Sequence, residues 1–184
     1  MIYLIRHGLD DENYIGGYSN APLIPDGIRQ IICTRNFIEI SDLNFNKIYS
    51  SDILRAQQTA NIINKNYKLN IIYDKNLREL DKGKLTGMDK AIAYYKYPLY
   101  SNLKDINIKY PDGESMQNLY DRIYKYLNSI DYDDAIVVTH RGVINMIYYI
   151  LNNINLDMQK ERFGVDHGSV HELDLNKKKI KRIF

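Results

Sequence analysis

The sequence has one cysteine, no tryptophan and only four prolines. A single cysteine, Cys33, excludes an internal disulfide and a metal site built from several thiolates. No apolar run reaches the roughly 18–20 residues that a membrane span needs. No basic segment precedes the first strand-like run, so we expect no signal peptide. These absences favour a cytoplasmic protein with no membrane partner.

An excess of charge of one sign is also missing. Lys and Arg number 25 and Asp and Glu number 23, which gives a formal net charge of +2. This balance predicts no nucleic-acid partner, and the basic cluster at residues 177–182 is typical of a solvated turn between two closing strands. With 184 residues, 45% of them hydrophobic, the chain is expected to form one domain over residues 1–184, as a monomer or a homodimer.

Strand-like and helix-like segments alternate along the chain, which predicts an α/β fold with a mostly parallel central sheet flanked by helices. Helices are expected after Pro25, after Ser51 as an N-cap, after Ser115 and from Arg141. The tyrosine-rich, weakly periodic residues 88–110 are expected to form an irregular lid or insertion that selects the substrate. The expected strands are residues 2–5, 47–50, 70–73, 135–139, 170–175 and 179–183.

The triplet Arg6-His7-Gly8 follows the first expected strand directly. It is therefore delivered to the carboxyl end of that strand, where open α/β sheets bind ligands. A fixed cation, an imidazole that titrates near neutrality and a glycine that lets a ligand approach the backbone together suit a phosphate. The triplet thus indicates a phosphate-handling site.

A second histidine, His140, ends the strand expected at residues 135–139 and is followed by Arg141 and Gly142. A parallel sheet would bring this histidine to the same edge as His7. One imidazole could then attack phosphorus, while the other, protonated, would stabilise charge on the phosphoryl oxygens.

A third segment places an arginine, Arg55, in the first turn of a helix. Its guanidinium would add to a helix end that already favours anions, and a planar fork of donors fits phosphate oxygens better than a lysine does. A phosphate ester also needs an acid to protonate the leaving oxygen. Glu79, Asp81 and, at a greater distance, Glu12 are the candidates for that acid.

These segments resemble, in order, the motifs of the histidine phosphatase superfamily. The matching blocks are Arg-His-Gly at 6–8, Gly…Pro-Leu…Gly at 17–27, Ser-Ser-x-x-x-Arg-Ala-x-x-Thr-Ala at 50–60, Leu-Arg-Glu at 77–79, Pro-x-Gly-Glu-Ser at 111–115, and the stretch 163–170. The resemblance implies a three-layer, phosphoglycerate mutase-like fold.

The resemblance also assigns expected roles to individual residues. It makes Glu79 the acid, beside His7 and His140 as the other catalytic residues. It implies no metal and no cofactor, and the chain has no His-x-x-x-His pair or Gly-x-x-x-x-Gly-Lys-Ser/Thr loop. Apart from the family pattern, the position of Arg141 after His140 makes it a further candidate. The residues expected to bind the substrate are Arg6, Gly8, Asn13, Arg55, Arg141 and Ser169.

The chain departs from the family pattern at several positions around the pocket. Leu9 stands where a polar residue usually follows Arg-His-Gly, and Asn20 replaces the usual aspartate. The loop at 13–17 is shortened and lacks an arginine, whereas Arg141 stands where a small residue is more frequent. These changes leave the catalytic set intact and put the identity of the substrate in doubt.

The expected function is hydrolysis of a small phosphorylated metabolite. A cofactor-dependent phosphoglycerate mutase is the first alternative, but Leu80 follows Glu79 where mutases carry an arginine, and residues 88–110 contain no arginine. The other alternative is a non-catalytic relative that binds a phosphorylated ligand or partner. That alternative does not explain why the chain carries the complete set of histidines, arginines and Glu79.

Overall fold

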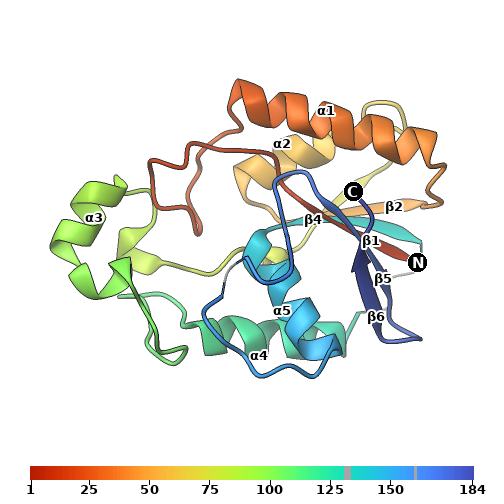
Figure 1. The fold of residues 1–184 in the computed structure, drawn as a ribbon. Coiled ribbons are helices and arrows are strands. Elements are labelled where there is room, and N and C mark those ends of the chain that lie inside the picture. Colours follow the sequence, from red (N-terminus) through yellow and green to blue (C-terminus); the bar gives the residue numbers. More distant parts are fainter. Residues whose placement is uncertain (131–133, 160) are drawn as a thin grey trace.

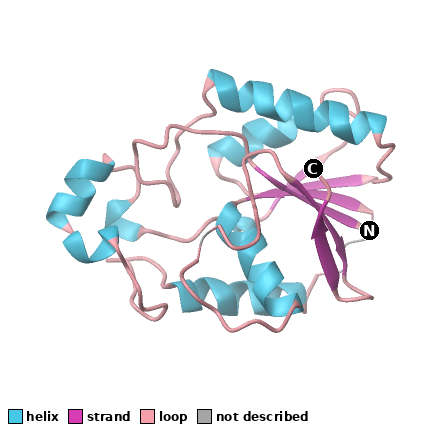
Figure 2. Ribbon diagram, viewed as in Figure 1, coloured by secondary structure: helices cyan, strands magenta, loops and turns pink. Residues whose placement is uncertain are grey.

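A computed structural model describes residues 1–130, 134–159 and 161–184 and has one six-stranded sheet in the order β3-β2-β4-β1-β5-β6 (Figures 1 and 2). Strands β1 to β4 are parallel to one another, β5 is antiparallel to β1, and β6 is antiparallel to β5. The strands are β1 Ile2–Arg6, β2 Lys47–Ser50, β3 Ile71–Tyr73, β4 Ala135–Thr139, β5 Val170–Asp174 and β6 Lys179–Arg182. All six lie within one residue of the expected ranges.

Helices cover both faces of the sheet, as Figure 1 shows. Alternate residues of β1 divide between two cores because successive side chains of a strand point to opposite faces. Tyr3 and Ile5 pack with residues of α1 and α2, whereas Ile2 and Leu4 pack with residues of α4 and α5. The expected three-layer α/β sandwich is therefore confirmed. The α-helices are α1 Pro25–Ile40, α2 Leu54–Ile63, α3 Lys90–Lys96, α4 Met116–Leu127 and α5 Arg141–Leu151.

The helix starts follow the sequence signals with one exception. Ser115 caps α4 through a capping box with Asn118, as its position before the helix predicts. The prediction that Ser51 caps α2 is wrong, because α2 begins at Leu54 and its N-cap residue makes no side-chain cap. The Ser51 hydroxyl is instead within hydrogen-bonding distance of His140. The serine is thus used by the site rather than by the helix.

Residues 88–110 are more regular than their sequence indicates. They contain α3 and a short 3-10 turn at Pro98–Ser101, so the expectation of an irregular segment is wrong for this part. Asp89 starts α3 by accepting the N–H groups of Ala91 and Ile92, and the ring of Tyr100 stacks on that of Tyr110 at 4.9 Å. Because the stacked rings are ten residues apart in the sequence, their contact produces no helical or strand periodicity from which the structure could be predicted.

This segment lies beyond the carboxyl ends of the strands, at the far left of Figure 1. Backbone hydrogen bonds tie its start to the loop that follows β1, from Lys90 N–H to the Asn13 carbonyl at 2.9 Å and from Ile15 N–H to the Met88 carbonyl at 2.8 Å. It therefore stands at the edge of the sheet to which the sequence assigns the site. No helix in the described ranges is both long and apolar enough to cross a membrane.

Candidate active site

The two histidines of the sequence motifs lie side by side at the carboxyl edge of the sheet. Strands β1 and β4 are adjacent and parallel with Arg6 opposite Thr139, so the next residues, His7 and His140, leave the sheet together. The His7 N–H also donates to the Thr139 carbonyl at 3.0 Å. Both imidazoles are buried, and their ring centroids are 5.0 Å apart. The expected pairing of the two histidines is present.

The hydrogen bonds of His7 fix its tautomer. Its Nδ1 lies 2.7 Å from the Gly8 carbonyl, which can only accept, so Nδ1 carries the proton. Its Nε2 accepts from Arg55 Nε at 3.1 Å and therefore keeps a lone pair. Burial first, and then the charges of Arg55, His140 and Arg6, hold the His7 pKa well below its ordinary value. Nε2 therefore remains a nucleophile below neutral pH.

His140 is neutral with the described residues around it. Its Nδ1 lies 3.4 Å from Arg55 Nη2, a group that can only donate, so Nδ1 carries a lone pair. Its Nε2 then donates to Ser51 Oγ at 2.9 Å. Burial and the charges of Arg55 and Arg6 hold the His140 pKa well below its ordinary value. The protonated form expected from the sequence therefore requires the added charge of an anion beside it.

Arg55 reaches the site from the first turn of α2, as the sequence motif indicates, and its side chain is buried. Besides His7, it donates to the Gly17 carbonyl at 2.7 Å and to the Ser19 carbonyl at 3.1 Å. The threonine of the same motif, Thr59, accepts the Gly8 N–H at 3.1 Å and donates to the Arg55 carbonyl at 2.8 Å. One turn of α2 thus fixes both the guanidinium and the loop that carries the nucleophile.

Arg6 supplies a buried cation on the other side of His7. Its Nη1 donates to the Val165 carbonyl at 2.8 Å and its Nη2 to His167 Nε2 at 2.6 Å. Its Nε is buried and has no hydrogen-bond partner among the described residues. Burial, followed by the nearby charge of Arg141, lowers the Arg6 pKa to about 10, so the group stays charged at neutral pH. A buried unpaired donor at a cavity wall suits an anionic ligand.

His167 is the residue that the sequence analysis missed, since its motif gave it no expected role. Its ring lies 5.5 Å from that of His7, and its Nε2 accepts from Arg6. Burial and then the charge of Arg6 lower its pKa to about 3, so it is neutral. The signal that could have found it is topological: β5 runs antiparallel beside β1, with Val170 opposite Ile5. Residues just before β5 must therefore lie beside residues just after β1.

Backbone amides hold the carboxyl group of Glu79, which lines the same cavity as His7. Its Oε1 accepts the Leu80 N–H at 2.8 Å and its Oε2 the Gly142 N–H at 3.2 Å, at the start of α5. A side chain at Gly142 would overlap Glu79 Oε1, so only glycine permits this approach. Arg122 of α4, paired with Glu114 at 2.9 Å, donates to the Glu79 carbonyl at 3.2 Å. The Pro-x-Gly-Glu-Ser block at 111–115 thus helps to position Glu79, because its Glu114 holds the arginine that bonds the Glu79 backbone.

A cavity of about 150 Å³ lies among these groups. His140 is not one of its lining residues but lies against His7, with the ring centroids 5.0 Å apart. The cavity lining includes Arg6, His7, Arg55 and Glu79, and Glu12 lines it too, whereas Asp81 is not among its lining residues and accepts the Gly83 N–H at 2.8 Å in a turn. The other charged or polar lining residues are Asp10, Asp11, Tyr14, Lys82, Lys90, Arg141 and Asn145. Glu79 is therefore the candidate acid that the geometry favours over Asp81.

The remaining expected binding residues have mixed positions. Arg141 lines the cavity and also pairs with Glu161 at its rim. Ser169, Asn13 and Gly8 are not among the lining residues. Ser169 is buried with its hydroxyl 2.8 Å from His171 Nε2, and Asn13 is exposed.

Gly8 serves the site differently from what the sequence indicates. A Cβ there would lie 2.6 Å from the carbonyl oxygen of Gly27 in α1. Gly8 therefore lets the loop after β1 pack against α1, and its carbonyl orients His7. The expectation that this glycine admits a ligand to the backbone is corrected, because α1 fills that space.

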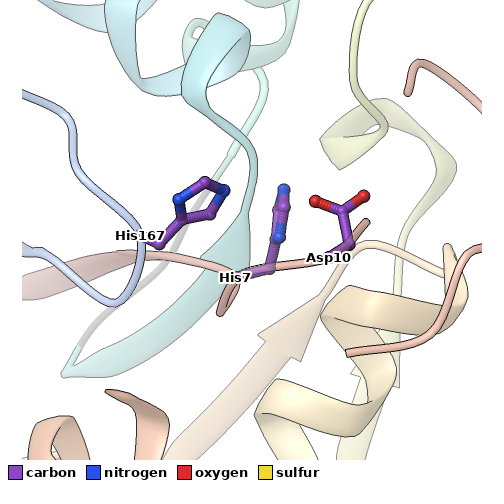
Figure 3. Close-up of side chains that lie close together, drawn as sticks. All are labelled: His7, Asp10 and His167. Atoms are coloured by element: carbon purple, nitrogen blue, oxygen red, sulfur yellow. The ribbon is translucent and has the colours of Figure 1, made fainter. Parts of the chain in front are cut away.

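His7, Asp10 and His167 form a group whose ligand atoms lie within 4.8 Å of one another, a spacing that could hold a metal ion (Figure 3). The chemistry of the donors argues for an anion instead. Nε2 of His7 and Nε2 of His167 each already accept from a guanidinium, and two arginines beside a cation are unfavourable. The group fits a site that attracts negative charge.

A larger cavity, of about 620 Å³, lies at the opposite end of the sheet between the ends of α4 and α5 and the β5–β6 hairpin. Its lining among the described residues includes Met1, Tyr124, Leu151 and Lys178 and no histidine or arginine. It therefore lacks the groups that phosphate chemistry needs. The smaller cavity at the strand ends is the candidate active site.

Comparison with known proteins gives results in line with this geometry. A family model described as the histidine phosphatase superfamily, branch 1, matches residues 2–183. The chain is 35% identical over 138 residues to an Escherichia coli protein named "Probable phosphoglycerate mutase GpmB", and 33% identical over 136 residues to its Salmonella arizonae counterpart. Each alignment covers 70% of this chain and 61% of the relative, so the chain matches about three fifths of the length of these relatives.

Solved structures give the fold. The α-ribazole phosphatase from Shigella flexneri superimposes with a TM-score of 0.83 at 22% identity, covering 99% of this chain and 94% of that one. A mycobacterial glucosyl-3-phosphoglycerate phosphatase gives a TM-score of 0.76 at 19% identity, covering 99% and 96%. At these identities the similarity concerns the fold alone, and it confirms the fold expected from the motifs.

Proposed function

The chain belongs to the histidine phosphatase superfamily, branch 1, and from this premise we propose that it hydrolyses a small phosphorylated metabolite through a phosphohistidine on His7. The observation that carries the proposal is the state of His7 Nε2. This nitrogen is unprotonated, buried and surrounded by Arg6, Arg55 and His140. A nucleophile among fixed cations is the arrangement that attack on a phosphate needs.

In the first step, the lone pair of His7 Nε2 forms a bond to phosphorus. The bond from phosphorus to the ester oxygen breaks, and its electron pair stays on that oxygen, which takes a proton from Glu79 to leave as an alcohol. In the second step, water attacks the phosphohistidine and gives a proton to the Glu79 carboxylate. The nitrogen–phosphorus bond then breaks, its electron pair returns to His7, and inorganic phosphate leaves.

The buried arginines supply the charge that stabilises the transferring phosphoryl group. Arg6 offers its unpaired Nε, and Arg55 can turn its Nε from His7 to a phosphoryl oxygen as Nε2 attacks. His140 joins them once a bound anion favours its protonated form. We therefore propose that neither a metal ion nor an organic cofactor takes part, and that the enzyme works in the cytoplasm, where its free cysteine, Cys33, stays reduced.

The alternative is a phosphoglycerate mutase, favoured by the name of the 35% identical relatives. A mutase must keep water from its phosphorylated intermediate. The segment at 88–110 carries no arginine to close on a substrate, and α3 has Tyr95 almost fully exposed. The names of the structural neighbours, an α-ribazole phosphatase and a glucosyl-3-phosphoglycerate phosphatase, also favour hydrolysis.

One set of measurements tests the proposal. The purified protein should hydrolyse a generic aryl phosphate, and His7→Ala should lose that activity while keeping the same unfolding temperature. Acid-quenched enzyme given labelled substrate should carry acid-labile, base-stable label on His7. Label on another residue type, or activity that disappears with a chelator and returns with magnesium, would overturn the mechanism.

The same protein separates hydrolysis from the alternatives. With 3-phosphoglycerate and a bisphosphoglycerate primer, a phosphatase releases inorganic phosphate, whereas a mutase interconverts the isomers. A non-catalytic relative would bind phosphate and do neither. Measuring kcat/KM on a panel of phosphomonoesters then ranks the candidate substrates. We expect a small phosphomonoester, and not a nucleic acid, to be the substrate.

A further inference from the structure

A carboxylate, Asp10, stands where the phosphoryl group has to bind. It is buried, lines the cavity, and has Oδ2 3.5 Å from Arg55 Nε, the same donor that holds the nucleophile of His7. Figure 3 shows its carboxyl group beside the His7 ring, on the side away from His167. The mechanism proposed above gives this residue no role.

An ionised Asp10 conflicts with the proposed substrate. A phosphate that reaches His7 Nε2 and Arg55 must come close to the carboxylate, and two anions sharing one site disfavour each other's ionisation. A proton on Asp10 removes the repulsion. It also supplies an O–H that can donate to a phosphoryl oxygen.

We propose that Asp10 binds the phosphoryl group in its protonated form, so that the protein takes up a proton with its substrate and works best in acid. The inference rests on the proposed function, because it concerns the same phosphate site. Its motive is the juxtaposition of Asp10 with Arg55 and the nucleophile of His7. In the absence of phosphate, the carboxylate is the counter-charge of Arg55.

The charges that face Asp10 come from four directions. The positive charges are Arg55, from α2, and Arg6, from the end of β1. The negative charge of Glu12 comes from the same loop as Asp10, and the ring of His167, which is neutral, comes from the loop before β5. Burial raises the pKa of Asp10, Arg55 and Arg6 oppose this rise, and Glu12 adds to it. The net direction of the pKa is upward, which favours the protonated form of Asp10.

The rest of the site also tolerates acid. The lowered pKa of His7 favours its unprotonated Nε2 as the pH falls. Because His140 also gains a proton when an anion binds, the contribution of Asp10 has to be read from the difference between the wild type and a variant that lacks the carboxylate.

The test compares the wild type with Asp10→Asn, which mimics the protonated carboxyl at every pH. Binding of inorganic phosphate is measured by calorimetry from pH 4.5 to 8 in buffers of different ionisation enthalpy, together with kcat/KM on an aryl phosphate. The ionisation of the phosphate itself cancels in the comparison. We expect about tenfold tighter binding by Asp10→Asn at pH 7.5, equal binding at the acid end, and one proton fewer taken up.

Two further variants complete the design. Asp26→Asn removes the same charge from the exposed face of α1, outside the cavity lining, and it should keep the pH dependence of the wild type. Asp10→Ser supplies a neutral O–H donor, so it replaces Asp10→Asn if that variant does not fold.

The inference is overturned if the phosphate affinity of Asp10→Asn, divided by that of the wild type, stays constant with pH. Weaker phosphate binding by Asp10→Asn at neutral pH also overturns it, because the ionised carboxylate would then be the useful form. Failure of the proposed function has a different signature: the wild type would bind phosphate without hydrolysing any ester. The pH dependence of that binding would still decide the state of Asp10.

Discussion

The floor and the rim of the cavity are built in different ways. The floor consists of Arg6, His7 and Arg55, with His140 against His7, and all four are buried at the end of a strand or the start of a helix and held by hydrogen bonds. The rim consists of Arg141 and of the segment at 88–110, which includes Lys90 and carries the almost fully exposed Tyr95. A buried group held by hydrogen bonds keeps its position without a substrate, as catalysis requires, whereas exposed side chains can adapt to different substrates.

The comparison also separates two kinds of sequence signal. The resemblance to the superfamily predicts every floor residue, whereas among the departures from its pattern Arg141 lines the cavity and Leu9 does not. Asp10 lines the cavity beside the floor and is buried, but no motif predicted it. We therefore expect changes in the floor to abolish turnover of all substrates and changes in the rim to alter their ranking.

The largest effect is expected from Arg55→Lys. A lysine keeps the positive charge but loses the planar fork that donates at once to His7, Gly17 and Ser19. We expect kcat/KM to fall about 10²–10³-fold on every phosphate ester, as it does when a preorganised donor is lost. Steady-state kinetics on aryl and alkyl phosphates measure this.

The matched control for that variant is Arg29→Lys, on the exposed face of α1, which should leave kcat/KM within twofold, or about 0.4 kcal/mol. A loss confined to one substrate class in Arg55→Lys would show that the floor also selects substrates. The distinction between floor and rim would then be broken.

A smaller and more selective loss is expected from Gly142→Ala. The new methyl group would overlap Glu79 Oε1 and displace the carboxyl from the amide of residue 142. Because an alkoxide needs a proton to leave and a phenolate does not, alkyl phosphates should lose about 10²-fold and aryl phosphates much less. Alanine favours a helix over glycine, so α5 itself is not weakened by the change.

A double-mutant cycle tests that explanation. If Gly142→Ala acts through the carboxyl of Glu79, adding it to Glu79→Gln should cost almost nothing further on alkyl phosphates. Additive losses would mean that residue 142 acts on the site independently of Glu79. Equal losses on both substrate classes would instead give Glu79 a positioning role.

The sequence predicts residues at the ends of regular strands better than residues in loops. His7 and His140 were predictable because period and β-branching mark buried strands, and parallel strands deliver their carboxyl ends to one edge. His167 and Asp10 were not, since each sits in a loop whose path depends on packing between β1, β5 and α1. Ser51 was misread because a serine before a helix can bond a side chain as readily as the helix start.

Asn13 and Ser169 were expected at the phosphate, but sequence position does not give side-chain direction. Ser169 immediately precedes β5, and its hydroxyl faces the buried His171 instead of the cavity. Asn13 is exposed in the loop after β1, and its carbonyl accepts a hydrogen bond from the backbone N–H of Lys90 at the start of α3. Both residues shape the backbone around the site, and neither lines the cavity.

The smallest effect is expected at the rim, from Arg141→Gly. Arg141 begins α5, lines the cavity and pairs with Glu161, whose side chain is mostly exposed. A pair with an exposed partner is weak, so a substrate with a second anionic group can compete for the guanidinium. Losing that contact should lower kcat/KM about tenfold, or 1.4 kcal/mol, on a phosphoglycerate and hardly at all on a simple aryl phosphate.

Glu161→Gln is the reciprocal variant, because it releases Arg141 without removing it. It should leave aryl phosphate turnover unchanged and raise kcat/KM on the phosphoglycerate by up to about threefold, the worth of one exposed ion pair. If Arg141→Gly instead slows both substrates equally, the arginine acts on the floor through its field on Arg6, whose pKa it helps to lower. Arg141 would then belong with the buried cations, and substrate selection would have to be sought in Lys82, Lys90 and α3.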